Sequence, residues 1–270
     1  MPDRPENTPE VTGRTRVLGI LAHPTDHVKA PPKINRIARE RGSDAIMVPM
    51  NVAPENFEGF VNSLRTVLSF DGAIVTVPFK QAILPLCDEL SEQAAAVGAA
   101  NVIRRLADGR LVGDQLDGVG FLRGLEHAGI QVAGRSVYLV GAGGAANAVA
   151  FALAQAGIGR LTLANRSQHK SDELRERLLR HYPTLAVSLG TQDPSGHQLI
   201  INGTSLGMQA TDPLPLDVTR LTPQMTVAEV VQEPERTALL VAAENVGCRV
   251  HLGRHMLEHQ VQLMADFLGL

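Results

Sequence analysis

Short apolar runs alternate with helical stretches up to about residue 115 of the chain. The apolar runs predict β-strands and the longer stretches between them predict helices. The predicted strands are 17–22, 45–49 and 73–77, and the predicted helices are 33–41 and 54–68. This β-α-β-α order indicates a largely parallel sheet that is covered by helices.

Two shorter β runs, 102–105 and 111–113, flank Ala107-Asp108-Gly109, which predicts a hairpin turn. A second α/β series starts with a helix predicted over 118–128. Its further strands are predicted at 136–140, 160–164, 186–189, 199–202 and 225–230, with a helix over 172–181. A last helix, 255–268, follows this series, and we expect it to return to the first one.

The strand predicted over 136–140 leads directly into Gly141-Ala142-Gly143-Gly144-Ala145-Ala146 and an alanine-rich helical stretch. The first glycine allows a tight turn, the second lets the backbone approach a pyrophosphate, and the small Ala146 permits close helix packing. The amides and the dipole of the helix N-terminus would then face the anion. The sequence predicts a dinucleotide phosphate site; the alternative is a tight turn of the kind found in any α/β protein.

The strand predicted over 160–164 ends at Asn165, Arg166 and Ser167, about 20 residues past the first glycine. An NAD enzyme would carry an acidic residue here for the ribose 2′-hydroxyl, and this chain has none. Arg166 and Lys170 offer cations to a 2′-phosphate, and Asn165 and Ser167 offer neutral hydrogen-bonding groups. The expected cofactor is therefore NADP; the alternative is a solvated basic start to the following helix.

These patterns predict an α/β protein of two domains, an N-terminal α/β domain with a mainly parallel sheet and a Rossmann-type NADP domain. The expected boundaries are a flexible tail over 1–15, an N-terminal domain over 16–116 that the helix 253–270 completes, and an NADP domain over 117–252. A length of 270 residues suffices for two modest domains. A cleft between them is where the cofactor could meet the substrate.

Composition excludes several classes of partner. The net charge of −3 gives no reason to expect nucleic acid or an anionic membrane. Cys87 and Cys248 fit neither a disulfide framework nor a zinc-ligand spacing, so we expect a reducing cytosol. No apolar run approaches the length of about 18 residues that a membrane span needs. Residues 1–14 lack the apolar segment of a signal peptide.

A series of short motifs is distributed along the chain. In order, they are Val75-Thr76-Val77-Pro78-Phe79-Lys80, Gly98-Ala99-Ala100-Asn101-Val102, Asp117-Gly118, the glycine loop, Asn165-Arg166-Ser167, Asn202-Gly203-Thr204-Ser205-Leu206-Gly207-Met208 and Met256-Leu257-Glu258-His259-Gln260. This series resembles the shikimate dehydrogenase family. The resemblance implies an NADP-linked, reversible oxidation of a ring alcohol to a ketone. It also implies that the N-terminal domain is the substrate domain and that the Rossmann-type domain binds the cofactor.

The resemblance also implies roles for individual residues. Hydride transfer to a ketone leaves an alkoxide that must gain a proton, and Lys80 and Asp117 are the family's pair for this step. The alternative is structural, in which Lys80 ends a strand and Asp117 caps the helix that begins at Gly118. Thr76, Asn101 and Gln260 match hydroxyl-binding positions, with turn and packing roles as the alternative. Further cofactor contacts are implied for Thr204, Val230 and Gly253.

Several positions depart from the family pattern. His27-Val28-Lys29-Ala30-Pro31 lacks the Ser-x-Ser pair that would hold a substrate carboxylate, Ile74 replaces an asparagine, Gln115-Leu116 replaces Asn-Thr, and Val231 stands where tyrosine is frequent. Each lost hydrogen bond costs on the order of 1 to 3 kcal/mol, so we expect shikimate to bind poorly. Either Lys29 or Arg254 supplies a replacement cation, or the substrate is less polar there. A solvent-exposed Lys29 is the alternative for that residue.

We expect the partner to be a small cyclic hydroxy acid or polyol, and the protein to be a monomer or homodimer. Three other functions remain as alternatives. Gly203-Thr204-Ser205-Leu206-Gly207, with Asp217 and His251 downstream, matches a serine hydrolase motif, but a loop is expected after it where a helix is required. An inverted zinc-protease pattern is matched by His255-Met256-Leu257-Glu258-His259, but no third ligand can be identified. His23 and His27 are expected to be loop residues. We therefore expect no metal site. The third alternative is an NADP-binding sensor without turnover.

Overall fold

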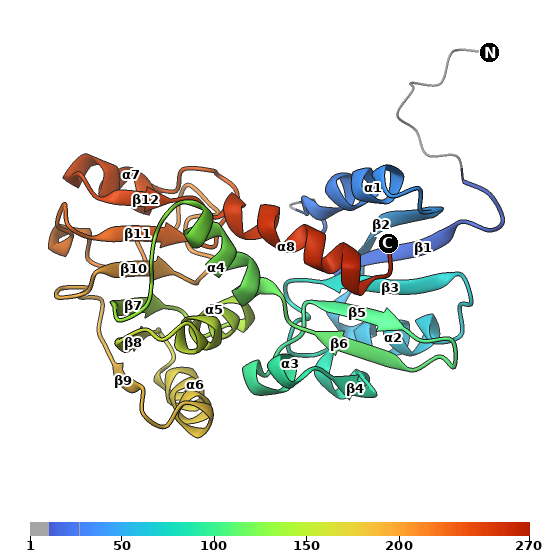
Figure 1. Ribbon diagram of the computed structural model, residues 1–270, viewed down its shortest axis with the longest axis horizontal. Helices are drawn as coiled ribbons and strands as arrows, with labels where there is room; N and C mark the ends of the chain where they lie inside the picture. The colour runs from blue at the N-terminus through green and yellow to red at the C-terminus, as the bar shows by residue number, and fades with distance from the viewer. Residues whose placement is uncertain (1–10, 27) are drawn as a thin grey trace, which may run out of the picture. The chain divides into compact units, whose positions relative to one another are not determined.

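The computed structural model describes residues 11–26 and 28–270, and their contacts divide the chain into two compact units. The first unit contains the described residues up to Ser91, together with Ala100–Asp114 and Val261–Leu270. The second contains Glu92–Ala99 and Gln115–Gln260. In this described part each unit is built on one six-stranded sheet with helices, which confirms the predicted α/β class (Figure 1). None of the described helices is long and apolar enough to cross a membrane.

The first unit begins with the predicted β-α-β-α order. Its elements are β1 (Arg16–Ala22), α1 (Ala30–Glu40), β2 (Ala45–Asn51), α2 (Phe57–Leu64), β3 (Phe70–Val75), β4 (Glu89–Leu90), β5 (Val102–Arg105), β6 (Leu111–Asp114) and the end of α8 (Arg254–Phe267). The strands lie in the order β2-β1-β3-β5-β6-β4. Strand β1 is parallel to β2 and β3, whereas β5 is antiparallel to β3 and β6. The predicted β5–β6 hairpin is therefore confirmed.

Helix α1 begins at Ala30 rather than at residue 33, because a helix accepts prolines such as Pro31 in its first turn, where their missing N–H is not needed. Its apolar face, which includes Ile34, is buried. The Asn35 side chain donates to the carbonyl oxygen of Met47 at 3.0 Å and accepts from the Met47 N–H at 2.7 Å. These two bonds attach α1 to β2.

Other segment ends also differ from the prediction. The helix expected over 54–68 is a short 3-10 turn, Pro54–Asn56, followed by α2, which ends at Leu64. Part of the expected tail is folded, because Thr15 is buried and donates its N–H to the carbonyl oxygen of Thr12 at 3.2 Å. Residues 1–10 of that tail lie outside the described part of the chain.

The second unit has the strand order of a dinucleotide-binding fold. Its elements are α3 (Glu92–Val97), α4 (Asp117–His127), β7 (Ser136–Val140), α5 (Gly144–Gln155), β8 (Arg160–Ala164), α6 (Gln168–His181), β9 (Ala186–Leu189), β10 (Leu199–Asn202), β11 (Thr226–Glu229), α7 (Ala238–Val246), β12 (Arg249–His251) and the start of α8. The order β12-β11-β10-β7-β8-β9 is parallel throughout. The direction of strand addition reverses between β7 and β10, which is where such folds bind their ligands.

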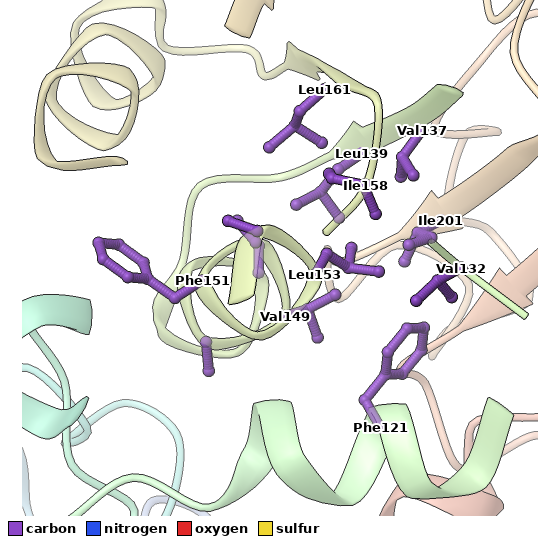
Figure 2. Close-up of a cluster of buried hydrophobic side chains, with 14 of the residues drawn as sticks. Phe121, Val132, Val137, Leu139, Val149, Phe151, Leu153, Ile158, Leu161 and Ile201 are labelled. Atoms are coloured by element: carbon purple, nitrogen blue, oxygen red, sulfur yellow. The ribbon is translucent and has the colours of Figure 1, made fainter. Parts of the chain in front are cut away.

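Apolar side chains on both faces of this sheet form the core of the second unit. On one face, Leu139 of β7 and Val149 and Leu153 of α5 are fully buried, and the Phe121 ring points from α4 into this cluster (Figure 2). On the other face, the cluster contains Tyr138 and residues of α7. Because both faces are covered by apolar side chains, the strands are continuous hydrophobic runs rather than alternating ones.

Helix α4 approaches α5 so closely that a side chain at Gly118 is not tolerated. A Cβ at this position would lie 2.3 Å from the carbonyl oxygen of Ala148. Any larger residue would push α4 away from α5. Because Asp117 immediately precedes Gly118, this contact also determines where the backbone of Asp117 lies.

Two segments belong to a different unit from the one expected. Glu92–Ala99 was expected in the substrate domain but groups with the second unit, because Val97 and Ala99 are buried in its core. The helix α8 was expected to complete the substrate domain. Only Val261–Leu270 groups with the first unit, whereas Met256 is buried in the core of the second. An apolar pattern shows that a face is buried but not what covers it.

His251 makes the second unit sensitive to acid. Its side chain is 2% exposed, its ring stands edge-on to Phe121 at 6.1 Å, and its Nε2 has no hydrogen-bond partner among the described residues. Burial is the main cause that lowers the pKa of His251, and together with the charges of His255, Arg249 and His259 it brings the pKa to about 4.

Because the pKa of His251 in the folded protein lies below its ordinary value of 6.5, the unfolded chain binds a proton more readily than the folded one. The stability that comes from burying His251 uncharged is therefore complete above about pH 6.5 and is lost as the pH falls through about 4. We expect Tm to fall by about 5 °C or more between pH 7.5 and pH 4.5. The Tm of the matched variant His251→Gln should fall less over the same pH interval. Parallel curves for the two proteins would contradict the assignment of this effect to His251.

Candidate functional site

The loop between β7 and α5 has the backbone geometry of an anion site. Gly141 has a φ of +117°, which favours glycine, and a Cβ there would lie 2.9 Å from the carbonyl oxygen of Gly203. Gly143 precedes the first residue of α5, and a Cβ there would meet no atom within 4 Å. No side chain caps this N-terminus and its first turn has no acidic residue. The first amides of α5 therefore fit a phosphate group.

The contact between Gly141 and Gly203 brings together two loops that follow β7 and β10. These strands are neighbours at the point where the strand order reverses. Ala146 is fully buried, and a Cβ at Gly203 would lie 2.8 Å from its Cβ, so a larger residue at either position would separate the loops. This is the close packing that the glycine-rich pattern predicted.

The loop after β8 presents cations at the start of a helix. Helix α6 begins at Gln168 rather than at residue 172, so Lys170 lies in its first turn. Arg166 and Lys170 are exposed, and neither forms an ion pair with another described residue. The Nδ2 of Asn165 donates to the carbonyl oxygen of Ser167 at 2.9 Å, which closes the turn. These four residues can surround a 2′-phosphate.

The loop after β10 is held by a buried polar network that the sequence did not reveal. Asn202 accepts from the N–H and the hydroxyl of Thr204 at 3.0 and 2.7 Å. Its Nδ2 donates to the carbonyl oxygen of Leu206 at 2.9 Å and to both carboxylate oxygens of Glu229 at 3.1 and 3.0 Å. Glu229 is fully buried at the end of β11. The signal available in the sequence was Glu229 itself, a charged residue at the end of a mostly apolar strand.

The remaining predicted cofactor residues lie around the ends of β10 and β11. The N–H of Val230 donates to the carbonyl oxygen of Asn202 at 3.1 Å, and Thr204 binds the side chain of the same asparagine. A Cβ at Gly253 would lie 2.0 Å from the carbonyl oxygen of Val231. The structure therefore gathers Thr204, Val230 and Gly253 beside the same two strand ends.

Three predicted residues of the first unit lie at one edge of its sheet. The N–H of Val75 donates to the carbonyl oxygen of Asn101 at 2.8 Å, and the N–H of Thr76 donates to that of Leu21 at 3.0 Å. The carbonyl oxygen of Lys80 accepts from the N–H of Ala100 at 2.8 Å. Because β5 is antiparallel to β3, its first residues meet the carboxyl end of β3. Thr76, Lys80 and Asn101 are thereby brought together.

A stacked aromatic pair anchors the turn that carries Lys80. Phe79 is buried, and its ring lies 3.9 Å from that of Phe57 of α2 at an interplanar angle of 4°. The N–H of Phe79 donates to the carbonyl oxygen of Thr76 at 2.8 Å. The backbone on either side of Lys80 is therefore fixed by packing and by hydrogen bonds.

His23 follows β1 at the same edge. Its N–H donates to the carbonyl oxygen of Val77 at 3.1 Å, and its Nδ1 lies 3.0 Å from the Oδ1 of Asn51, at the end of β2. From the sequence, His23 and His27 were both expected to be loop residues. His27 lies outside the described residues.

Asp117 and Gln260 belong to the second unit. Asp117 is buried and is the first residue of α4, and its N–H donates to the Oε1 of Gln115 at 2.9 Å. The suggested capping role of Asp117 is wrong, because the N-cap is Leu116 and no side chain caps this helix. Gln260 is buried, and its Oε1 has no hydrogen-bond partner among the described residues. The pairing of Lys80 with Asp117 stays a prediction.

The two candidate replacement cations differ in their surroundings. Lys29 is exposed and directly precedes α1. Arg254 is already engaged, since it forms ion pairs with Glu235 at 3.0 Å and Glu258 at 4.0 Å. Among the departing positions, Ala30, Ile74 and Val231 are buried and Val28 is half-buried.

The hydrolase motif lacks its structural context. Bends and turns follow Gly207 as far as Thr211, where a nucleophile elbow requires a helix. The Oδ1 of Asp217 accepts from the N–H and the hydroxyl of Thr219 at 3.0 and 2.6 Å. His251 is buried without a hydrogen bond at Nε2. These groups therefore do not form a hydrogen-bonded triad.

The histidines of α8 are occupied by other contacts. The Nδ1 of His255 lies 3.0 Å from a carboxylate oxygen of Glu258, and the ring of His259 packs at 5.2 Å from that of His127. Within the described ranges, no group of three or more histidine, cysteine, aspartate or glutamate side chains is arranged to hold a metal ion.

Comparison with known proteins identifies the family. Residues 20–103 match the shikimate dehydrogenase substrate-binding domain, and residues 125–191 match the shikimate/quinate 5-dehydrogenase domain. The shikimate dehydrogenase (NADP(+)) of Rubrobacter xylanophilus is 37% identical over 261 residues, which cover 94% of this chain and 90% of that protein.

Solved structures agree with this match. Shikimate 5-dehydrogenase from Thermus thermophilus, in complex with NADP(H) and shikimate, has a TM-score of 0.84 and 28% identity, with coverage of 94% of this chain and 93% of that one. Quinate dehydrogenase from Corynebacterium glutamicum, in complex with NAD, has a TM-score of 0.85 and 29% identity, with 94% of each chain covered. The sequence and structural matches extend over nearly the whole chain, which belongs to the shikimate dehydrogenase family.

Proposed function

We propose that this protein is an NADP-dependent oxidoreductase that interconverts a ring secondary alcohol and a ketone on a small cyclic hydroxy acid or polyol. The observation that carries the proposal is the uncapped N-terminus of α5 behind Gly143, at the reversal point of the parallel sheet. The relative from Rubrobacter xylanophilus and the quinate dehydrogenase from Corynebacterium glutamicum act, by their names, on shikimate and on quinate. We also propose that the protein is located in the cytosol. It is proposed to be a monomer or a homodimer, and size-exclusion chromatography would distinguish these two states.

The cofactor site is proposed from residues of the second unit. The amides that follow Gly143 bind the pyrophosphate, and Ala142, Gly144 and Ala145 form the rest of that loop. Arg166 and Lys170 bind the 2′-phosphate as exposed cations, with Asn165 and Ser167 beside them. The loop around Thr204, together with Val230 and Gly253, receives the nicotinamide half.

The chemistry divides between the cofactor and the chain. NADP, when bound, supplies the exchange of a hydride with the substrate carbon. The chain moves the proton at the substrate oxygen, through the Lys80 amine and the Asp117 carboxylate. Thr76 and Asn101 orient the substrate hydroxyls from the sheet edge of the first unit. The buried Oε1 of Gln260 is available to accept a hydrogen bond from a further substrate hydroxyl.

Kinetic assays test this function directly. The protein should oxidise a cyclic polyol acid such as shikimate or quinate, or a carboxylate-free analogue, with NADP as the acceptor. Tight NADP binding without turnover across such a panel would instead support the sensor alternative. Labelling of Ser205 by a fluorophosphonate would support the hydrolase alternative.

We further propose that substrate-carboxylate recognition is altered, because Val28 and Ala30 place no hydroxyl where the family carries two serines. The double substitution Val28→Ser with Ala30→Ser should lower KM for shikimate by about tenfold or more, since each restored bond to a charged group contributes substantially. Serine is tolerated at the helix start that Ala30 occupies.

A carboxylate-free analogue is the control for this pair of substitutions, and its KM should not change. An unmodified protein that already binds shikimate in the ordinary micromolar range of KM values would overturn the altered-recognition proposal. That result would leave the oxidoreductase assignment intact.

A further inference from the structure

Glu229 is a buried carboxylate that the proposed chemistry does not use. It is fully buried, and it accepts from three neutral donors: the Nδ2 of Asn202, the hydroxyl of Thr237 at 2.7 Å and the N–H of Val231 at 3.4 Å. A buried carboxylate is costly unless it is hydrogen-bonded in this way. The donors come from the end of β10, from the start of α7 and from the segment after β11.

The network continues from Glu229 into the loop after β10. Asn202 has its Nδ2 on Glu229, and through the same amide group it holds both Thr204 and Leu206. The N–H of Leu206 also donates to the hydroxyl of Thr204 at 3.0 Å. Glu229 therefore fixes the orientation of the Asn202 amide through its Nδ2. The amide in turn holds the loop backbone, because its Oδ1 accepts from Thr204 and its Nδ2 donates to Leu206. In α7, Thr237 caps the helix by accepting from the N–H of Leu240 at 3.3 Å.

We propose that Glu229 is a positioning residue of the cofactor site: by orienting Asn202 it holds the loop Gly203–Gly207 in the conformation that receives the nicotinamide half of NADP. The proposal rests on the proposed cofactor site for that half. Glu229 itself touches neither cofactor nor substrate in this assignment. The same loop approaches the glycine-rich turn through Gly141 and Gly203.

The protonation state of Glu229 provides a signature of this role. Burial raises the pKa of Glu229, and the hydrogen bonds from Asn202, Thr237 and Val231 offset only part of that rise, so that the pKa lies at about 7. No charged group is among the main causes of this shift, and the loop's other carboxylate, Asp212, accepts from the N–H groups of Gly207 and Gln209 at 2.9 Å. Below about pH 7 the carboxyl gains a proton and loses an acceptor site for Asn202.

The variant Glu229→Gln retains the size of the side chain and replaces one acceptor oxygen by an NH2 group. This group opposes the NH2 of Asn202, so the variant mimics the protonated carboxyl at every pH. Glu244→Gln is the matched control, because Glu244 is a surface carboxylate of α7 that pairs with Arg236. Neither substitution changes a residue of the proposed proton relay.

Calorimetric titration should use two probes, NADP+ and 2′-phospho-ADP-ribose, which lacks only the nicotinamide. At about pH 8 we expect Glu229→Gln to weaken NADP+ binding by about tenfold and to leave 2′-phospho-ADP-ribose within about twofold of the unmodified protein. At about pH 6 the difference in NADP+ affinity between Glu229→Gln and the unmodified protein should be smaller, because the carboxyl of the unmodified protein is then largely protonated. Equal weakening of both probes, or unchanged binding of NADP+, would overturn the proposal.

A second measurement does not depend on the cofactor. In ligand-free protein, the amides of Thr204 and Leu206 should exchange with deuterium about tenfold faster in Glu229→Gln than in the unmodified protein or in Glu244→Gln. Unchanged exchange in this loop would contradict the positioning role. If the loop responds but the unmodified protein binds neither probe, the NADP assignment fails and the role of Glu229 in holding the loop stands.

Discussion

Replacing Lys80 with alanine is expected to lower kcat by about 10² or more, which is the usual scale for the loss of an acid-base group. The turn that carries Lys80 is fixed by the stacking of Phe79 on Phe57 and by the bond from Ala100 to the Lys80 carbonyl, neither of which needs the lysine side chain. The fold should therefore survive the substitution. Steady-state kinetics together with calorimetric NADP binding would measure both effects.

Lys33→Ala in α1 is the matched control and should turn over normally, and NADP binding should be normal in the Lys80→Ala protein. The pairing with Asp117 is tested by a double-mutant cycle. If the two groups act as a unit, Lys80→Ala combined with Asp117→Asn should cost about as much as either alone. Near-normal kcat in Lys80→Ala would refute the proton-transfer role, and additive losses would refute the pairing.

The double substitution Arg166→Ala with Lys170→Ala is expected to raise KM for NADP by about 10² while KM for NAD changes by less than about twofold. Each cation offers a charge-assisted hydrogen bond or point charge to the 2′-phosphate, and NAD lacks this group. Both side chains are exposed at the start of α6, so stability should change little.

Arg180→Ala, at the other end of the same helix, removes a cation without affecting the proposed phosphate site, and it should leave the preference unchanged. The decisive quantity is the ratio of kcat/KM for the two cofactors. A clear preference of the unmodified protein for NAD would contradict the proposed specificity. Retention of the ratio in the double variant would show that other residues bind the 2′-phosphate.

The elements of the fold were largely predictable because strands buried on both faces are continuous apolar runs, such as residues 137–140 of β7. The glycine loop was predictable because its requirements are local. A positive φ at Gly141 and an uncapped helix behind Gly143 follow from the residues themselves. Local chemistry was thus visible in the sequence.

Features that depend on distant segments were not predictable. Nothing in the chain near Glu229 indicates that Asn202 and Thr237 supply its donors, because those residues come from separate elements. The sequence also assigned Glu92–Ala99 to the wrong unit, since its apolar residues fit either core. Asp117 had the residue type of a helix cap, yet it lies one position too far along to act as one.

The C-terminal segment has a consequence for biosynthesis. Val261–Leu270 belongs to the first unit, where Leu268 is buried and a Cβ at Gly72 would lie 2.8 Å from its Cδ2. Arg41 donates to Asp266 at 2.8 Å and to the carbonyl oxygen of Leu270 at 3.0 Å. Although its strands are translated early, the first unit therefore lacks part of its cover on the ribosome until residues 261–270 have emerged.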